Sequence, residues 1–292
     1  MVNDVAPISV VIPAFNAESF IGDAIRSVLA QTLRPAEIIV IADDCTDRTK
    51  QIATELGATV LEQKRRNMAA GLNLGIRATS QPWIALLDAD DIWEKDKIAL
   101  QWEAAEACPE VAIVSCTLCT LCNGEIIASK ARALRERWQD GESVAISRHG
   151  HYFAKVEGDF LVRFNIQTTT VLLRRDVFSV LGDFDESLLY GQTFEFFARV
   201  LARYPLAFVD KPLVYVRVHN ANHTRNVEAS LASHLSIVNR MLKNPDLYPP
   251  GSGEAHREVM KSTFLRTQRF LAQQEAARST EPLVADRRSQ NS

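Results

Sequence analysis

The stretch Leu86-Leu87-Asp88-Ala89-Asp90-Asp91 decides the fold, because an apolar run stops there abruptly at three acidic residues. The run begins at Trp83, so a short buried strand is expected over 83–87 with carboxylates at its carboxyl end. Outward from this strand, apolar runs alternate with amphipathic segments through about the first hundred residues, which is typical of βαβ units around a mostly parallel sheet. Ligands of open α/β sheets bind beyond the carboxyl ends of strands, so the acidic stretch is the first candidate site.

The same patterns predict the other elements of the chain. Strands are expected at 8–12, 37–41, 58–61, from 111, at 169–173 and at 213–216, and helices at 20–29, 68–78, 94–107 and 193–204. A turn that begins a helix is expected at 182–186, and residues 123–165 are polar and irregular, which is typical of an insertion. The predicted fold class is therefore α/β.

Length, composition and charge limit the class of protein. The chain has 292 residues, 47% of them apolar, which permits one large α/β domain with an appendage and excludes disorder as the main state. The 33 Lys and Arg against 36 Asp and Glu give a net charge of −3, which favours neither nucleic acid nor an anionic membrane as partner. The N-terminus shows no secretory signal, and the uncharged stretch Val111–Gly124 is too short to span a membrane. The expected location is the cytoplasm.

The last part of the chain shows helical patterns only. Residues 227–242 carry an apolar face made of Val227, Leu231, Leu235, Val238 and Leu242. A Pro- and Gly-rich break separates this segment from a second amphipathic segment at 255–275. We expect a globular domain over 1–225, a helical extension over 226–276 that packs on the domain or on a second subunit, and a disordered tail over 277–292.

Five motifs, in their order and spacing, give the chain a resemblance to a known family. They are Ile8–Asn16, Ile38–Thr49, Leu86–Asp91, Gly182–Glu186 and Tyr215–His219. Together they resemble the family 2 glycosyltransferases of the GT-A fold, over residues 8–223. The resemblance implies a Rossmann-like, mostly parallel twisted sheet flanked by helices. It also implies an enzyme of cell-surface polysaccharide biosynthesis that transfers a sugar, with inversion, from a nucleotide sugar, expected to be UDP-linked, to a glycan, lipid or other acceptor.

The acidic stretch has the chemistry of a metal site. Asp88 and Asp90 are one residue apart at a strand end, so an extended backbone places both carboxylates on the same side. A divalent cation held there would neutralise the charge that develops on a departing diphosphate. The resemblance implies that Asp90 binds Mn²⁺ or Mg²⁺ bridging the diphosphate and that Asp88 is turned toward the ribose of the nucleotide. Asp91 is expected to cap the following helix.

The loops after the first two strands contain the expected nucleotide contacts. The resemblance implies that Pro13, Phe15 and Asn16 wrap the nucleobase, although Phe15 could instead pack in the core. It also implies an acidic residue after the second strand that binds the uracil edge. Asp43 is the preferred residue for this contact and Asp44 is the alternate.

The position of the general base departs from the family pattern. Measured back from the helical Arg199, the Glu-Asp pair of the family is Gln192-Thr193 here, and neither side chain is a base at neutral pH. Glu195 could substitute if the helix begins late or bends, and Asp183 or Asp185 could act from the preceding turn. The other alternative is low or absent activity.

A late Arg-x-His pattern adds two further candidates. The resemblance implies that Arg217 lies near the donor phosphates and that His219 binds phosphate or the metal. A structural role for His219 is the open alternative. His223 lies in an expected loop and is assigned no role.

Other basic residues leave two roles open. Arg65-Arg66 could contact the diphosphate, and the basic residues of the insertion could bind an anionic or lipid-linked acceptor, but a solvated surface is the commoner role of such clusters. The insertion residues are Arg132, Arg135, Arg137, His149 and His151.

The five cysteines indicate neither a disulfide framework nor a metal motif. Their number is odd, and Cys116, Cys119 and Cys122 alternate between the two faces of an expected strand. We therefore expect them to be small buried apolar residues.

Two functions stay open at the level of sequence. The first is a metal-dependent, inverting glycosyltransferase, and the alternative is a nucleotide-sugar-binding homologue with weak or no transferase activity, because of Gln192-Thr193. A nicotinamide-binding enzyme is disfavoured, since no G-x-G-x-x-G follows the first strand. Nucleic acid is not an expected partner, and association with the inner face of a membrane or into a homo-oligomer stays open.

Overall fold

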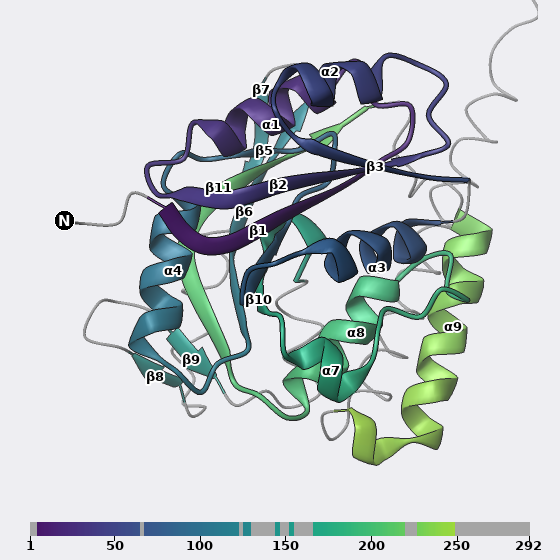
Figure 1. Cartoon of the computed structure of the whole chain (residues 1–292). Coiled ribbons are helices and arrows are strands. Elements are labelled where there is room, and N and C mark those ends of the chain that lie inside the picture. The colour runs from purple at the N-terminus through teal and green to yellow at the C-terminus, as the bar shows by residue number, and fades with distance from the viewer. Residues whose placement is uncertain are drawn as a thin grey trace, which may run out of the picture.

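The computed structural model describes residues 5–64, 67–122, 125–129, 144–146, 152–154, 166–219 and 227–248. Its strands join into one sheet, of which one part is parallel (Figure 1). The parallel strands are β1 (Val5–Ala14), β2 (Arg34–Asp43), β3 (Thr59–Gln63) and β4 (Trp83–Leu86), in the order β3-β2-β1-β4. The helices between them are α1 (Ile21–Leu29), α2 (Thr49–Glu55) and α3 (Met68–Ala78). Because these strands are parallel, the carboxyl ends of β1, β2 and β4 meet at one edge of the sheet.

The rest of the sheet is mixed. β10 (Leu172–Arg174) runs antiparallel to β4 and to β6 (Ile113–Cys122), and β11 (Leu206–Val218) runs parallel to β6. Short strands follow at the margins: β5 (Ile92–Trp93) and β9 (Tyr152–Ala154) pair with β11, β7 (Glu125–Ser129) pairs with β6, and β8 (Val144–Ile146) pairs with β9. Parallel order is thus concentrated in the amino-terminal part of the chain.

Helices cover both faces of the sheet. The remaining helical segments are α4 (Lys97–Ala107), the 3-10 turn η2 (Thr168–Thr170), α7 (Val177–Leu181), α8 (Gln192–Leu201), α9 (Val227–Lys243) and the 3-10 turn η4 (Pro245–Leu247). Figure 1 shows α1 and α2 on one side of β1 and β2, and α3 and α8 on the other. Along β1, Val10 packs with Ile21 of α1, whereas Val11 belongs to the opposite cluster with Leu72 of α3 and Phe196 of α8. This alternation buries both faces of the strand and explains its continuous apolar sequence.

The predicted α/β class is confirmed, and two expected elements are corrected. Residues 169–173 do not form one strand, because Thr170 donates its backbone N–H to Gln167 O at 3.0 Å and closes η2 before β10. Residues 182–186 form a loop between α7 and α8 instead of a helix start. The described parts of the expected insertion at 123–165 contain β7, β8 and β9, which are paired strands that periodicity did not indicate.

The carboxyl-terminal helix α9 shares the core of the rest of the chain. Ile237, Val238 and Met241 are buried, and Ile237 and Met241 belong to the same apolar cluster as α3 and α8. The predicted apolar face of this helix is partly wrong, because Leu235 is 48% exposed while Ile237 faces the core. The boundary at 225 stays a prediction. The second expected helix at 255–275 and the expected tail at 277–292 lie outside the described residues.

No helix within the described ranges combines the length and the apolarity that crossing a membrane requires.

Candidate active site

The chain turns sharply at the acidic stretch after β4. Leu87 N–H donates to Val11 O at 3.1 Å, one residue beyond β4, and Asp91 N–H then donates to Asp88 O at 3.0 Å. The Oδ1 atom of Asp88 is buried and has no hydrogen-bond partner in the described part of the chain. Burial and the negative charge of Asp90 raise the pKa of Asp88 to about 7. A buried carboxylate oxygen without a partner is suited to bind a ligand hydroxyl or a cation.

The structure brings together Asp90 and His219, the two residues that the sequence assigns to the metal. Oδ2 of Asp90 lies 2.9 Å from Nε2 of His219, across 129 residues of sequence. Strand β11, which pairs with β5 and β6, carries His219 back to the acidic stretch. The ring of Phe20 stacks on the imidazole, with centroids 4.5 Å apart. The sequence did not indicate a role for Phe20, because nothing in the local pattern at the start of α1 predicts a contact with β11.

Asp91 does not cap the following helix, which corrects the expectation from the sequence. The residue that precedes α4 is Asp96, since residues 92–93 first pair with β11 as β5. Asp91 is 2% exposed, and its Oδ1 accepts the backbone N–H of Arg217 at 3.1 Å. Burial and the neighbouring charges of Asp88 and Asp90 raise the pKa of Asp91 well above its usual range. Asp91 therefore ties the acidic stretch to the end of β11.

The donors at this turn fit a divalent cation. The carboxylate oxygens of Asp88 and Asp90 are the hard ligands that Mg²⁺ and Mn²⁺ prefer, and His219 adds a nitrogen donor. Within the residues that the structure describes, no three His, Cys, Asp or Glu side chains are arranged so that they could hold a metal ion by themselves. A cation here would therefore need further oxygen ligands, which the diphosphate of a substrate can provide.

The end of β2 holds Asp43 in a fixed position. Asp43 is 8% exposed, and its Oδ1 accepts a hydrogen bond of 3.0 Å from Nε2 of Gln63 on β3. Asp44 is exposed, adopts the left-handed region with φ of 57° and donates its backbone N–H to Gln63 O at 2.8 Å. The carboxylate of Asp43 is therefore held in place, whereas Asp44 lies in a turn and faces solvent.

The loop after β1 presents one exposed aromatic side chain at the same edge. Phe15 is 48% exposed, which excludes the alternative that it packs in the core. Asn16 has a φ of 45°, and its Oδ1 accepts the backbone N–H of Thr46 at 2.9 Å. Pro13, at the end of β1, pairs with Ile41 of β2. Asn16 therefore joins two loops, whereas the ring of Phe15 is exposed at their edge.

Further hydrogen bonds fasten the loop after β1 to the loop after β2. Thr49 Oγ1 accepts the backbone N–H of Ala17 at 2.7 Å, and Asp47 accepts that of Glu18 at 3.0 Å. Cys45 Sγ lies 3.4 Å from the backbone N of Asn16. The polar run after β2 was visible in the sequence, but its role as a brace for the other loop was not.

Glu195, the first candidate for a substitute base, is held in a buried ion pair. Its side chain is 1% exposed, and its two oxygens accept hydrogen bonds from Nε and Nη2 of Arg199, each at 3.0 Å. The hydroxyl of Tyr248 donates to Oε1 of Glu195 at 2.6 Å. Helix α8 begins at Gln192, so it does not start late, and Glu195 lies buried in its first turn. This geometry fits a structural carboxylate and not a base that faces an acceptor.

Asp185, the second candidate, is also engaged. Its Oδ1 accepts the N–H and the hydroxyl of Ser187 at 2.8 and 2.6 Å, and its Oδ2 pairs with Arg240 of α9. Burial works to raise the pKa of Asp185, but the bonds from Ser187 and Arg240 outweigh it and hold the pKa below its usual range. Nη1 of Arg240 also lies 3.9 Å from Oε1 of Glu195, so one arginine faces both candidate acids.

The family position of the base is occupied by side chains that cannot accept a proton. Gln192 is 5% exposed, and its Oε1 is buried without a hydrogen-bond partner in the described structure. The hydroxyl of Thr168 in η2 donates to Oγ1 of Thr193 at 3.2 Å. η2 leads into β10 beside β4, since Leu86 N–H donates to Val171 O at 3.4 Å. The start of α8 is thereby connected to the edge that carries Asp88.

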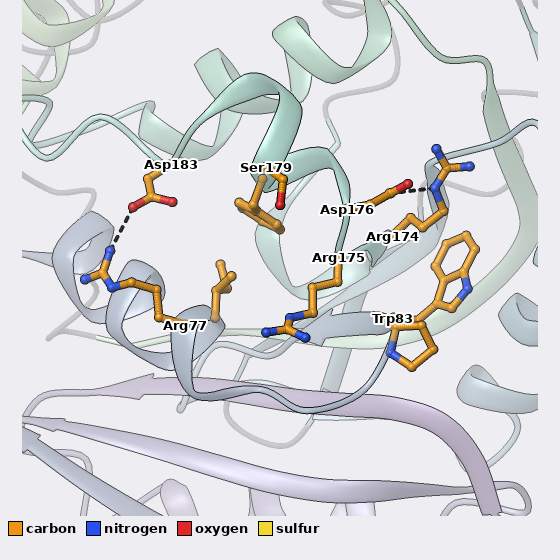
Figure 2. Close-up of a pocket in the computed structure, with 10 residues that line it drawn as sticks. Arg77, Trp83, Arg174, Arg175, Asp176, Ser179 and Asp183 are labelled. Atoms are coloured by element: carbon orange, nitrogen blue, oxygen red, sulfur yellow. Dashed lines mark hydrogen bonds and ion pairs between the residues drawn. The ribbon is translucent and has the colours of Figure 1, made fainter.

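A pocket of about 660 Å³ lies at the other end of β4, around Trp83 (Figure 2). Figure 2 shows Arg77 paired with Asp183 and Arg174 paired with Asp176, and both pairs have N–O distances of 2.7 Å. Asp183, the remaining alternative base, therefore faces this pocket and not the edge with Asp88. The pocket is separate from the candidate active site, because Trp83 begins the strand that ends before Asp88.

The remaining expectations concern cysteines and residues outside the described ranges. Cys116 and Cys119 are buried, in agreement with an apolar role, but Cys122 is only half-buried, which corrects that part of the prediction. All five cysteines are free thiols. The residues of the chain for which the structure gives no description include Arg65, Arg66, Arg132, Arg135, Arg137, His149, His151 and His223.

Comparison with known proteins decides the family. The model of the family described as "Glycosyl transferase family 2" matches residues 9–182, which is more than half of the chain. The chain belongs to glycosyltransferase family 2. It is therefore an enzyme of a sugar-transferring family, as the resemblance implied, and its fold is that of the GT-A glycosyltransferases.

Individual relatives agree with this assignment. An uncharacterised glycosyltransferase of Rickettsia typhi is 26% identical over 238 residues, which cover 81% of this chain and 71% of the relative. WfgD of Escherichia coli is named as a UDP-Glc:α-D-GlcNAc-diphosphoundecaprenol β-1,3-glucosyltransferase. It is 34% identical over 98 residues, which cover 32% of this chain and 39% of the relative.

Solved structures share the fold at low sequence identity. TarS of S. aureus in complex with UDP-GlcNAc aligns with a TM-score of 0.63 and 16% identity, over 80% of this chain and 66% of that one. The mannosyltransferase PcManGT of Pyrobaculum calidifontis, in complex with GDP-Man and Mn²⁺, aligns with a TM-score of 0.64 and 16% identity. The second alignment covers 94% of this chain and 81% of that one.

Proposed function

We propose that this glycosyltransferase uses a UDP-linked sugar and inverts the configuration at the transferred carbon, with Mn²⁺ or Mg²⁺ bound at Asp90. The observation that carries the proposal is the contact of 2.9 Å between Asp90 and His219, beside the unpartnered Oδ1 of Asp88. Two acidic side chains and an imidazole at the carboxyl edge of a parallel sheet are suited to hold a cation and a diphosphate together.

Two lines of support favour a UDP-sugar as donor. TarS is in complex with UDP-GlcNAc, and the name of WfgD contains UDP-Glc. In this chain, the ordered carboxylate of Asp43 can accept the imide N–H of uracil, and the exposed ring of Phe15 can contact the face of the base. Asp44, on the solvent-facing turn, is the alternate contact.

The chemistry is a single displacement at the anomeric carbon. The acceptor oxygen forms a bond to C1 as the bond from C1 to the diphosphate oxygen breaks, and the acceptor proton passes to a base or to water. A bound cation would neutralise the charge on the leaving diphosphate. PcManGT, which shares the fold, is in complex with Mn²⁺. Asp90 and His219 would hold the cation, and Oδ1 of Asp88 would accept a ribose hydroxyl.

A second candidate function is nucleotide-sugar binding with slow or absent transfer. The observation that favours it is the absence of an acid at Gln192-Thr193, together with the pairing of Glu195 with Arg199 and of Asp185 with Arg240. Without a positioned base, the rate falls by the factor that general-base catalysis contributes, about 10²–10⁴. Both candidate functions predict nucleotide binding, but only the first predicts rapid sugar transfer.

We propose a lipid-linked or glycan acceptor, in the synthesis of a cell-surface polysaccharide at the inner face of the membrane. The support is the name of WfgD, whose acceptor carries a diphosphoundecaprenol group. Flotation of the full chain with vesicles, with and without a diphospholipid, tests this proposal. Binding that requires the diphospholipid supports a lipid-linked acceptor, and absence of binding to either vesicle contradicts a lipid-linked acceptor and leaves the glycan.

The decisive experiment measures thermal unfolding with UDP, GDP and ADP, each with and without Mn²⁺. UDP with Mn²⁺ is expected to raise the Tm most, and Asp90→Asn is expected to abolish the part of the shift that requires Mn²⁺. Asp176→Asn is the matched control, because Asp176 pairs with Arg174 at the opposite end of β4. If none of the three nucleotides raises the Tm of the unmodified chain, both candidate functions fail. Release of UDP from UDP-sugars in the presence of acceptor then separates the two.

A further inference from the structure

The amino-terminal end of α1 packs against the end of β11, next to the acidic stretch. Arg217 lies near the end of β11, and His219 follows the last residue of this strand. Both meet Phe20, which immediately precedes α1. The Phe20 and His219 rings stack with centroids 4.5 Å apart and an interplanar angle of 25°, and the guanidinium carbon of Arg217 lies 5.5 Å from the centroid of Phe20.

Asp23, in the first turn of α1, holds the guanidinium of Arg217. Its Oδ2 lies 2.6 Å from Nη2 of Arg217, whose side chain is only 16% exposed. The other oxygen of Asp23 accepts a hydrogen bond of 2.8 Å from Arg26. The bond from Arg26 and, to a smaller extent, that from Arg217 lower the pKa of Asp23 against the opposing effect of burial. Asp23 is therefore an anion that neutralises the charge of Arg217.

The end of β11 is thus fixed from two directions. On one side, the backbone N–H of Arg217 is held by Asp91, and His219 meets Asp90. On the other side, Asp23 and Phe20 hold the two side chains. The stacking contact with Phe20 restricts rotation of the His219 imidazole. The ring therefore loses less conformational entropy when it contacts Asp90.

We propose that Phe20 and Asp23 are positioning residues that set His219 against Asp90, and that Arg217 is an anchor in this network and not a ligand of the donor diphosphate. The inference rests on the proposed function, because its consequence is the affinity of the site for a divalent cation. Partners that orient the ligands of a metal typically change its affinity 10- to 100-fold when they are removed. The Arg-x-His spacing then places both side chains against Phe20 at the start of α1.

The experiment measures the Mn²⁺ concentration at the midpoint of the thermal shift in the presence of UDP. Phe20→Leu, which keeps the apolar volume and loses the ring face, is expected to raise this midpoint about tenfold. Phe20→Tyr keeps the ring and is expected to restore it. Lys50→Gln is the matched control, since Lys50 is 53% exposed and pairs with Glu62 outside this network, and it is expected to leave the midpoint unchanged.

A double-mutant cycle tests the anchor role of Arg217. Asp23→Asn and Arg217→Gln are each expected to raise the Mn²⁺ midpoint, and the double variant is expected to raise it no further than either single change. Asp23 is 46% exposed at its side chain, so this variant tests the network even if Phe20→Leu lowers the Tm without ligand.

Two results would overturn the proposal while leaving the proposed function intact. One is a Mn²⁺ midpoint that does not respond to Phe20→Leu or to Asp23→Asn. The other is that Arg217→Gln loses UDP binding in the absence of metal while Asp23→Asn keeps it. That result would identify Arg217 as a ligand of the diphosphate. If the unmodified chain shows no shift with Mn²⁺ and UDP, the proposed function fails first, and the positioning roles fail with it.

Discussion

The hydroxyl of Tyr248 donates a hydrogen bond of 2.6 Å to Oε1 of Glu195, and so connects the chain beyond α9 to the first turn of α8. Burial and this bond to Glu195 raise the pKa of Tyr248. The same carboxylate binds Arg199 through both oxygens. Glu195 therefore joins two helices that are far apart in sequence.

Loss of the Glu195 charge is expected to destabilise the protein. Glu195→Gln leaves Arg199 without its buried partner, and breaking a buried pair typically costs about 3–5 kcal/mol. Urea denaturation of the full chain measures the free energy of unfolding. Glu62→Gln is the matched control, because Glu62 is 62% exposed in its pair with Lys50, and a change below about 1 kcal/mol is expected there. A stable Glu195→Gln variant without turnover would instead identify Glu195 as the base.

An acid introduced at the start of α8 is expected to increase transfer. Thr193 occupies the family position of the base, and its hydroxyl oxygen accepts a hydrogen bond of 3.2 Å from the hydroxyl of Thr168. Thr193→Asp is expected to raise the rate of UDP release in the presence of acceptor by about 10²-fold or more. Thr193→Asn, which has the same shape without the charge, is the control. Equal rates for the two variants would show that this position does not act as a base.

Stability is expected to increase with pH because of a buried lysine. Lys97 is fully buried, with Nζ 2.6 Å from Oε1 of Gln101 and 3.9 Å from the centroid of the Trp93 ring. Burial lowers the pKa of Lys97 from 10.5 to about 8, against an opposing effect of the Cys116 thiol. Between these two pH values the unfolded chain binds more protons than the folded one, so the folded state gains relative stability as the pH rises.

The pH prediction is measured against Lys97→Met. Relative to this variant, the free energy of unfolding of the unmodified chain is expected to be level below pH 8 and to rise by up to about 3 kcal/mol toward pH 10.5. Urea denaturation at closely spaced pH values tests this. Parallel profiles for the two proteins would contradict it.

Two glycines of α3 are expected to respond oppositely to the same substitution. A Cβ atom at Gly75 would lie 2.4 Å from Cγ1 of Val11 on β1, whereas at Gly71 the nearest atom would be Nε2 of Gln63 at 3.5 Å. Gly75→Ala is expected to lower the free energy of unfolding by about 1–3 kcal/mol through overpacking. Gly71→Ala is expected to raise it by up to about 1 kcal/mol through helix propensity. Equal effects would show that α3 does not approach β1 this closely.

Much of the parallel part of the fold follows from local sequence. The expected helix at 68–78 has those bounds in the structure, because Asn67 caps it by accepting the backbone N–H of Ala70 at 2.9 Å. The strands around it were predicted from short apolar runs. By contrast, η2 and β5 were not predicted, since their pairing with distant strands leaves no periodic pattern in so few residues.

The candidate site likewise has features that follow from local sequence and contacts that depend on packing. By itself, the sequence determined the parallel strands, the acidic residues at the end of β4 and the lack of an acid at Gln192-Thr193, because each depends on neighbouring residues and their spacing. Only the tertiary structure decided that His219 meets Asp90 and that Glu195 is sealed by Arg199 and Tyr248. Those contacts depend on where β11 and α9 pack, and such long-range packing is set by the whole core and not by the residues of any one segment.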